Sequence, residues 1–467
     1  MSQRYDYEAI IIGAGISGLV CGCYLAKAGL KTLIVEKNAG PGGYCTSFKR
    51  GGFQFDACVH SLGSLRTGGN VRTILQELDI EERLRITRHD PSDIIIAPDF
   101  TVHYWNDIDK TVSDFQNIFP AESENIRKFF DYIQGCEGIA LMSLKSVTFQ
   151  MMLDRYFNDY RLKAVLSLPV LGNAGLPPSK ISSVTAVLIY KEFMLDGGYC
   201  PDGSVQALAD ILAARFREFG GDIFFSCAAK RIKIEEGKVL GVETAKNDIF
   251  SSKYLISSID ATSTYMSLIG ETASGQKIMS LLNKMEPSLS AFILYLGTDG
   301  KLENVRKDSV IWSMPHYDID NIYNLTVQGK VDELDWFLSR LSSNHSLFMF
   351  VNVPFVNEAY WQDNKRRLID IYINKMERIF PDLSRHIIYK DAATPMTLNK
   401  WTSNHKGASY GWAKTPSQFA VTGFTQNTAI ENLYLTGHWT TLYQGVGGVA
   451  YLGRDTSNKI LKKETAQ

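Results

Sequence analysis

The chain has 467 residues, 45% of them hydrophobic, and its 49 basic and 50 acidic side chains give a formal net charge of −1. That balance gives no reason to expect a nucleic-acid partner, and a chain of this length is expected to form two or three domains. No secretory signal and no apolar run of about 18 residues is visible, so we expect a cytoplasmic protein, with peripheral membrane contact left open.

The first elements expected are a buried strand over residues 7–12, a helix from about 16 to 28, and a second apolar strand that ends at Glu36. A glycine-rich turn joins the first strand to the helix. Strand, turn, helix, strand and acid follow one another within the roughly 30 residues of one βαβ unit, which is the fingerprint of dinucleotide binding. The glycines of the motif are Gly13, Gly15 and Gly18.

Each residue of this unit has a physical role in holding a dinucleotide. Gly13 permits the tight turn, Gly15 lets backbone approach a pyrophosphate, and Gly18 lets the helix pack close to the strand. The helix N-terminus offers free N–H groups to the phosphates. Glu36 lies about 20 residues further on, where an acid accepts hydrogen bonds from ribose hydroxyls.

The next segments change character twice. A second glycine cluster at 40–43 and the residues 52–56 predict an ordered loop region rather than a helix, and His60 follows it. From about 71 to 195, helical patterns dominate and aromatic residues and methionines are frequent. This region is expected to form a helical core or lid; the alternatives are an apolar substrate channel and a helix that dips into a bilayer surface.

The pattern is α/β again from about residue 196. A helix at about 205–219 is ended by a glycine pair, and a second insertion is expected from about 266 to 390, with a central strand of another sheet at 290–297. The chain closes with a strand at 432–436, a glycine-rich turn and a helix to about 462. Further strands are expected at 223–227, 229–234, 239–244 and 254–257.

In the order of its motifs the chain resembles the phytoene desaturase and carotenoid isomerase family of FAD flavoproteins, within the amine-oxidase-like superfamily. The motifs are the glycine turn with Glu36, the Gly42-Gly43 pair, the Phe55-Asp56 segment, the stretch from Gly197 to Gly221 and the C-terminal Leu435-Thr436-Gly437. The resemblance implies fold class α/β: a Rossmann-type FAD-binding domain of the discontinuous GR2-like kind with an inserted α+β substrate domain. The FAD-binding domain would comprise 1–70, 196–265 and 391–467, and the substrate-binding domain, with its helical apolar region, 71–195 and 266–390.

By residue match, the resemblance also implies which residues hold FAD. The amino-terminal set would bind the pyrophosphate and the adenosine, and the carboxy-terminal set would lie near the ribityl chain and the pyrimidine side of the flavin, where helix N–H groups stabilise negative charge on the reduced ring. The first set is Gly13, Gly15, Ile16, Ser17, Gly18, Glu36, Lys37, Gly42, Gly43, Tyr44, Arg231 and Ile232. The second set is Gly437, Gly447, Gly448 and Val449.

The candidate catalytic residues are His438, His60 and Tyr443. His438 directly follows the last strand, where the chain should pass the flavin ring, and His60 follows the Asp56 segment. Histidine titrates near neutral pH, so either could be a base, the alternative being a ring satisfied by backbone contacts. Tyr443, with Trp439, would form an apolar wall against a substrate, the alternative being that both rings simply pack. The seven cysteines and eight histidines show no metal-type spacing, so no metal site is expected.

The function expected is that of an FAD-dependent oxidoreductase that desaturates, saturates or isomerises an apolar polyene or prenyl-like substrate, or a natural-product intermediate. Two alternatives stay open: an amine or amino-acid oxidase of the same superfamily, in which Tyr410, Trp412 and Tyr443 form an aromatic cage, and a non-catalytic flavin-binding escort protein. No second dinucleotide fingerprint is visible, so a separate NAD(P) domain is not expected. The oligomeric state is not indicated.

Overall fold

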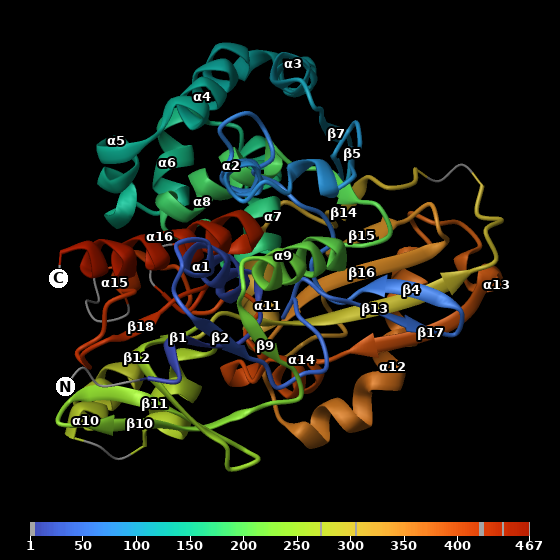
Figure 1. Ribbon diagram of the computed structural model, residues 1–467. Coiled ribbons are helices and arrows are strands. Elements are labelled where there is room, and N and C mark those ends of the chain that lie inside the picture. Colours follow the sequence, from blue (N-terminus) through green and yellow to red (C-terminus); the bar gives the residue numbers. More distant parts are fainter. Residues whose placement is uncertain (1–4, 271–272, 304–305, 420–424, 441–442, 467) are drawn as a thin grey trace.

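The computed structural model describes residues 5–270, 273–303, 306–419, 425–440 and 443–466. Two seven-stranded sheets organise the chain (Figure 1). The first has a parallel centre, in which β1 lies between β2 and β12, with β9 beside β2 and β18 beside β12. The isoleucines of β1 are buried, as expected for a strand covered on both faces. The parallel strands are β1 (Tyr7–Ile12), β2 (Thr32–Val35), β9 (Asp222–Phe224), β12 (Ile249–Ser257) and β18 (Leu433–Leu435).

Helices cover one face of this sheet, and an antiparallel extension widens its edge. α1 (Ile16–Lys27) packs between α9 (Gln206–Glu218) and α16 (Gly445–Thr465), and α2 (Asn70–Glu77) packs on α16. The close approach of α1 and α16 depends on Gly453, because a Cβ there would overlap the carbonyl oxygen of Ser17. The extension consists of β10 (Ala229–Glu235) and β11 (Lys238–Thr244), which continue from β12.

The second sheet is mostly antiparallel, in the order β17-β13-β16-β15-β14-β6-β7. Every residue of β13 and of β16 is buried, so these strands form the centre of the largest hydrophobic core. The strands are β6 (Asp93–Ile96), β7 (Thr101–Tyr104), β13 (Ser290–Thr298), β14 (Val310–Ser313), β15 (Phe337–Leu341), β16 (Ser346–Val353) and β17 (Ile387–Ala393).

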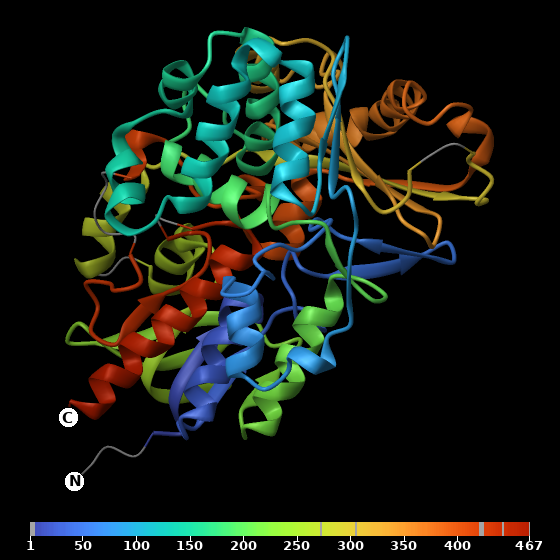
Figure 2. The same ribbon diagram turned by 90° about the horizontal axis from the view of Figure 1, so that it is seen from above.

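A group of helices gathers beside the second sheet and above the first, as the view from above shows (Figure 2). α8 passes directly into a π-helical turn, Tyr190–Met194. The helices of this group are α3 (Ile108–Ile118), α4 (Ser123–Gly135), α5 (Gly138–Ser143), α6 (Phe149–Tyr156), α7 (Tyr160–Ala174) and α8 (Ser183–Ile189). The remaining larger elements are α10 (Ala273–Leu282), α11 (Ile319–Val327), α12 (Glu358–Met376), α14 (Pro395–Thr402) and the strand pair β5 (Ile86–Arg88) and β8 (Tyr199–Pro201).

The predicted fold class is confirmed, and several predicted elements differ in detail. Residues 52–56 were expected in a loop, but β3 (Ser47–Arg50) and β4 (Phe53–Asp56) form a hairpin there. The strand expected at 223–227 ends at Phe224, and the one expected at 254–257 begins at Ile249. The predicted boundaries at 70 and 391 fall inside α2 and β17, and the two-domain division stays a prediction. No helix in the described ranges is long and apolar enough to cross a membrane.

Candidate functional site

The amino-terminal glycine turn has the geometry of a phosphate-binding loop. Gly13 has φ +100°, and its N–H donates to the Val35 carbonyl at 2.8 Å. A Cβ at Gly18 would overlap the carbonyl oxygen of Gly13, so the helix can approach the strand only with glycine there. A Cβ at Gly15 would meet nothing within 4 Å, because this position borders open space. No side chain caps α1, which leaves its first N–H groups free for a ligand.

Glu36 directly follows β2 and is fixed by backbone N–H groups on either side. Its Oε2 accepts from the N–H of Ala14 and its Oε1 from the N–H of Asn38, both at 2.8 Å. The carboxylate is buried but lines the same open space as Gly15. Each oxygen keeps a further lone pair, which a ribose hydroxyl can use.

The carboxy-terminal motif adjoins the amino-terminal one. The Ser17 and Thr436 hydroxyls are 2.7 Å apart and both side chains are buried, so the start of α1 and the end of β18 are held together. Gly437 follows with φ +90°, and α16 begins at Gly445 without a side-chain cap. Two uncapped helix starts therefore present free N–H groups to one space.

This space is a cavity of about 510 Å³, lined by both motifs. The lining of this cavity does not include Gly18, whose role is to let the helix pack on the strand. Arg231 and Ile232 of β10 are also absent from the lining. Ala228, just before β10, and Ala229, its first residue, line the cavity in their place. The predicted residues that line it are Gly13, Gly15, Ile16, Ser17, Glu36, Lys37, Gly42, Gly43, Tyr44, His60, Gly437, His438, Tyr443, Gly447, Gly448 and Val449.

The residues present fit FAD. The open Cβ position at Gly15 leaves room for a pyrophosphate, and Glu36 can accept from the ribose. On the other side, the Oε1 of Gln444 and the Oγ of Ser409 are buried in the cavity lining without a partner among the described residues. Buried polar atoms of this kind need a hydrogen-bonding ligand, and a flavin ring edge offers both donors and acceptors.

The two candidate histidines are neutral. Burial lowers the pKa of His438 to about 3, with the charge of Lys414 adding to the effect. Burial likewise lowers the pKa of His60 to about 3, helped by Arg340. Burial therefore opposes ionisation of both rings, because placing a charge in this interior is costly, and the role of either histidine as a base stays a prediction. Each ring can still exchange hydrogen bonds.

His438 lies between Asn404 and Tyr44 in the cavity wall. Its Nε2 lies 3.5 Å from the Asn404 amide nitrogen, and its ring stacks on Tyr44, with the centroids 6.1 Å apart. The buried ammonium of Lys414 donates to the carbonyls of His438 and Thr440 at 3.3 and 3.0 Å, which fixes the turn that follows β18.

The aromatic residues of the predicted cage do not all meet. Tyr410 and Tyr443 line the cavity, and the Tyr410 hydroxyl donates to the Gly172 carbonyl at 2.5 Å. Trp412 is absent from the lining and packs edge-on against Trp439, with ring centroids 4.8 Å apart. Trp439 itself lines the cavity, as the predicted apolar wall requires.

One charged residue of the cavity was missed by the sequence reasoning. Glu192, in the π-helical turn, lines the cavity and pairs with Arg66 through two contacts of 2.8 and 3.0 Å, while the Ser64 hydroxyl bonds the same carboxylate. The π-helical turn, an element frequent at functional sites, carries this carboxylate into the wall. No local signal indicates it, because its partners lie more than a hundred residues away in the chain.

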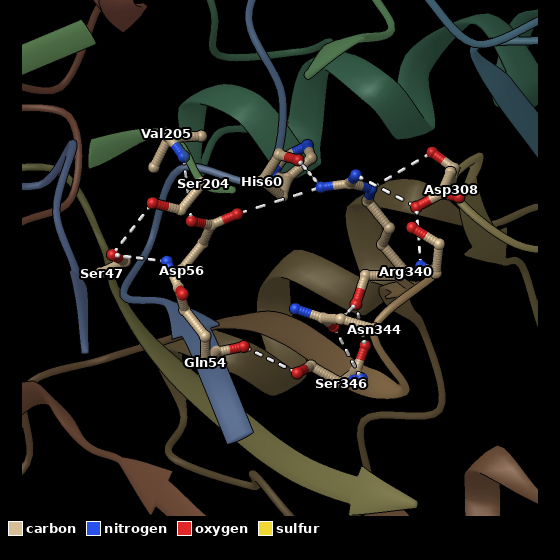
Figure 3. Close-up of polar contacts among 12 residues, drawn as sticks. Ser47, Gln54, Asp56, His60, Ser204, Val205, Asp308, Arg340, Asn344 and Ser346 are labelled. Carbon is tan, nitrogen blue, oxygen red and sulfur yellow. Dashed lines mark hydrogen bonds and ion pairs between the residues drawn. The ribbon is translucent and has the colours of Figure 1, made fainter. Parts of the chain in front are cut away.

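A second, polar cavity of about 240 Å³ lies beyond His60, the residue that its lining shares with the larger cavity. Figure 3 shows Arg340 of β15 extending between Asp308 and the turn that carries Asp56 and His60. Its Nη1 donates to the His60 carbonyl at 2.8 Å and lies 4.0 Å from Asp56, and its Nη2 donates to Asp308 at 3.4 Å. Burial raises the pKa of Asp56 to about 6. The second sheet thereby positions the backbone of His60.

Comparison with known proteins gives a consistent picture. A family model described as flavin containing amine oxidoreductase matches residues 16–461. Prolycopene isomerase 2 from an Oncidium hybrid cultivar is 24% identical, over 98% of this chain and 84% of its own length. Phytoene desaturase (lycopene-forming) from Pseudescherichia vulneris is also 24% identical, over 97% and 99%. An oxidoreductase from Methanosarcina mazei has a similar fold, with a TM-score of 0.66, 16% identity and coverage of 97% and 100%.

Proposed function

The chain belongs to the flavin containing amine oxidoreductase family and is an FAD-dependent oxidoreductase, and from this premise we propose that it acts on the double bonds of an apolar polyene. It would add hydrogen to them, remove hydrogen from neighbouring carbons, or isomerise them. The relatives named as an isomerase and a desaturase support this substrate class.

The observation that carries the proposal is an apolar wall in the cavity that contains the cofactor motifs. Leu188, Ile189 and Phe193 come from α8 and the turn after it, and Leu338 and Phe350 are paired across β15 and β16. Most of the lining surface is apolar. An extended hydrocarbon would gain about 25 cal/mol for each Å² of its surface that such a wall removes from water.

When bound, FAD supplies hydride transfer. The residues of the chain bind, orient and shield. The glycine turns and uncapped helix starts hold the cofactor, the apolar wall excludes water and aligns the substrate, and the neutral His438 and His60 avoid placing a charge beside a hydrocarbon. Tyr44 stacks on His438 and completes the wall on that side.

A direct test mixes a linear conjugated polyene, without oxygen, with the protein carrying oxidised FAD and, in a parallel sample, with the protein whose FAD has been reduced chemically, because removing hydrogen needs the oxidised flavin and adding hydrogen needs the reduced one. We expect the absorption band of the polyene to shift as double bonds are gained, lost or rearranged, with a matching change in the flavin band when hydrogen is transferred. Peroxide release from primary amines in air, with no change in any polyene, would assign the amine-oxidase alternative. A flavin that neither class of compound affects would favour the escort alternative.

The charges of the cavity argue against an amine. A bound ammonium is stabilised by a free carboxylate or by an aromatic cage. Glu192 is already paired with Arg66, and Glu36 bonds backbone N–H groups in the nucleotide half. Trp412, one member of the predicted cage, is absent from the cavity lining. Among the described residues that line the cavity, Glu192 and Glu36 are the carboxylates. An added cation would therefore have to break an existing pair.

A peripheral membrane contact would let such a substrate enter. Ile139 is 90% exposed, and Met142 and Met151 are also exposed on α5 and α6 beside Lys145. We expect sedimentation with vesicles of an anionic phospholipid, weakened by Ile139→Glu. Ile388→Glu, at an equally apolar exposed position on β17, is the matched control, and equal loss in both variants would contradict the contact. The cytoplasmic location stays a prediction.

A further inference from the structure

Four polar side-chain atoms in the lining of the large cavity have no partner among the described residues. They are the Nε2 of His60, the Oγ1 of Thr185, the Oγ of Ser409 and the Oε1 of Gln444. Leaving a buried polar group unsatisfied is costly, so a set of such groups in one cavity indicates groups that a ligand satisfies.

Two of the four belong to the cofactor side. Gln444 immediately precedes α16, whose glycine-rich start faces the cavity. Ser409 lies two residues before Gly411, and Gly411 packs so closely on the carbonyl of His438 that a Cβ there would overlap it. A bound FAD would account for these two atoms.

The other two lie on the apolar wall. Thr185 is 2% exposed and belongs to α8, and Leu188 and Ile189, three and four residues further on, share its face of the helix. The ring of His60 packs edge-on against Phe193, with centroids 5.7 Å apart, just beyond the end of that helix. A plain hydrocarbon would leave the Thr185 hydroxyl without a partner, whereas His60 borders the second cavity as well.

A substrate group that hydrogen-bonds with these side chains would have to be uncharged. A threonine hydroxyl and a neutral imidazole can each donate and accept, which suits a hydroxyl or a carbonyl. A carboxylate would need a free cation, but Arg66 is paired with Glu192, and Lys37 sits beside Glu36 in the nucleotide half, donating to Lys400 and Ser403. Burying a second anion near Glu192 would be costly.

We infer that the substrate is an apolar molecule bearing an uncharged oxygen group, and that Thr185 binds this oxygen. The inference rests on the proposed function and narrows its substrate class. His60 provides a second hydrogen-bonding position on the same wall, held in place by Arg340 through its carbonyl.

The experiment compares three probes that share one linear conjugated chain and end in a methyl, a hydroxymethyl or a carboxylate group. Their binding to the FAD-loaded protein is measured by perturbation of the flavin spectrum and by calorimetry. We expect the hydroxymethyl probe to bind most tightly. Thr185→Val, which keeps the shape of the side chain, should weaken that probe about tenfold and leave the methyl probe unchanged.

Two further variants make the result specific. Thr185→Ser keeps the hydroxyl and should restore most of the affinity. Ser183→Ala removes another unpartnered buried hydroxyl of α8, one that does not line the cavity, and should change no affinity.

Three results would overturn the inference: the methyl probe binding as tightly as the hydroxymethyl probe, the carboxylate probe binding most tightly, or Thr185→Val weakening all probes equally. Tight binding and turnover of the methyl probe would support the proposed function but would show that the substrate needs no oxygen group. Failure of all three probes to bind or react would instead remove the polyene substrate class itself.

Discussion

Glu36 has two tasks at once, since the carboxylate that can bind a ribose also bonds the backbone N–H groups of Ala14 and Asn38. Both of its oxygens face donors. An amide in its place would direct its NH2 group at one of those N–H groups, so the change from carboxylate to amide is not neutral here.

Replacing Glu36 by glutamine should weaken FAD binding about tenfold or more and lower the free energy of unfolding by about 1–2 kcal/mol. Flavin fluorescence and denaturant unfolding measure the two effects. Glu8→Gln is the control, because the exposed Glu8 also accepts from a backbone N–H, that of Lys31, outside the cavity. Unchanged FAD affinity in Glu36→Gln would remove Glu36 from the cofactor site.

The buried histidines make stability depend on acid. Folding lowers the pKa of His438 from 6.5 to about 3, so between these pH values the side chain is protonated in the unfolded chain and neutral in the folded chain. Its contribution to stability is complete above about pH 6.5 and is lost as the pH falls toward 3, by about 1.4 kcal/mol per pH unit. His438→Gln should flatten the pH dependence of unfolding between about pH 5 and 6.5 by that amount. An unaltered slope would show that His438 is solvated in solution.

At the residue scale, the nucleotide half was predictable because its signals are local. Gly13, Gly15 and Glu36 lie within one βαβ unit, where spacing alone specifies geometry. Thr185 and Glu192 were not predictable, because each reaches the cavity through the packing of a distant helix. Their residue types occur on the surface of most helices, so nothing in their own surroundings distinguishes them.

At the scale of elements, the contact of α1 with β1 depends on a missing side chain. A Cβ at Gly18 would overlap the carbonyl oxygen of Gly13, a backbone atom that cannot rotate away. The helix start and the phosphate turn are therefore a single rigid unit, and any added atom must separate them.

Gly18→Ala should cost about 1–3 kcal/mol of stability and strongly reduce FAD retention, because the turn must shift to admit the methyl group. Thermal unfolding and the flavin content of the purified protein measure this. Gly40→Ala is the matched control, since a Cβ there meets nothing within 4 Å and the backbone is not left-handed. Equal flavin content in the two variants would contradict the packing role.

Among the elements, periodicity predicted β1, α1, α9 and β13, whose patterns are long and regular. The sequence predicts a loop where β3 and β4 form a hairpin, because glycines at 51 and 52 form its turn and its strands are only four residues each. β6 and β7 lie in the region that the sequence predicts to be mainly helical. Strands this short are stabilised by pairing with the neighbouring strands of the sheet, so their own sequence predicts them poorly.

At the scale of the whole molecule, Arg340 connects parts of the chain that are far apart in sequence. It lies on the second sheet and bonds the turn that follows β4, where His60 stands, as well as Asp308. Its side chain is 11% exposed, so its pairing is largely shielded from water. Removing it leaves Asp56 and Asp308 near each other without a counter-charge.

Arg340→Met should destabilise the protein by about 3 kcal/mol near neutral pH. The loss should be smaller below about pH 6, because Asp56, whose pKa burial raises to about 6, is then protonated and needs no cation. Arg367→Met is the control: Arg367 is 52% exposed in its pair with Asp332, and its loss should cost under about 1 kcal/mol. Similar losses for both variants would contradict the shielded pairing.

The order of the first sheet has a consequence for biosynthesis. β12 pairs with β1 on one side and with β18 on the other, yet the three strands are drawn from residues 249–257, 7–12 and 433–435. A growing polypeptide therefore cannot complete this sheet until residues 433–435 have emerged from the ribosome, and such long-range closure is slow. The edge of β12 stays unpaired until then, and the cavity is complete only after the start of α16 has followed.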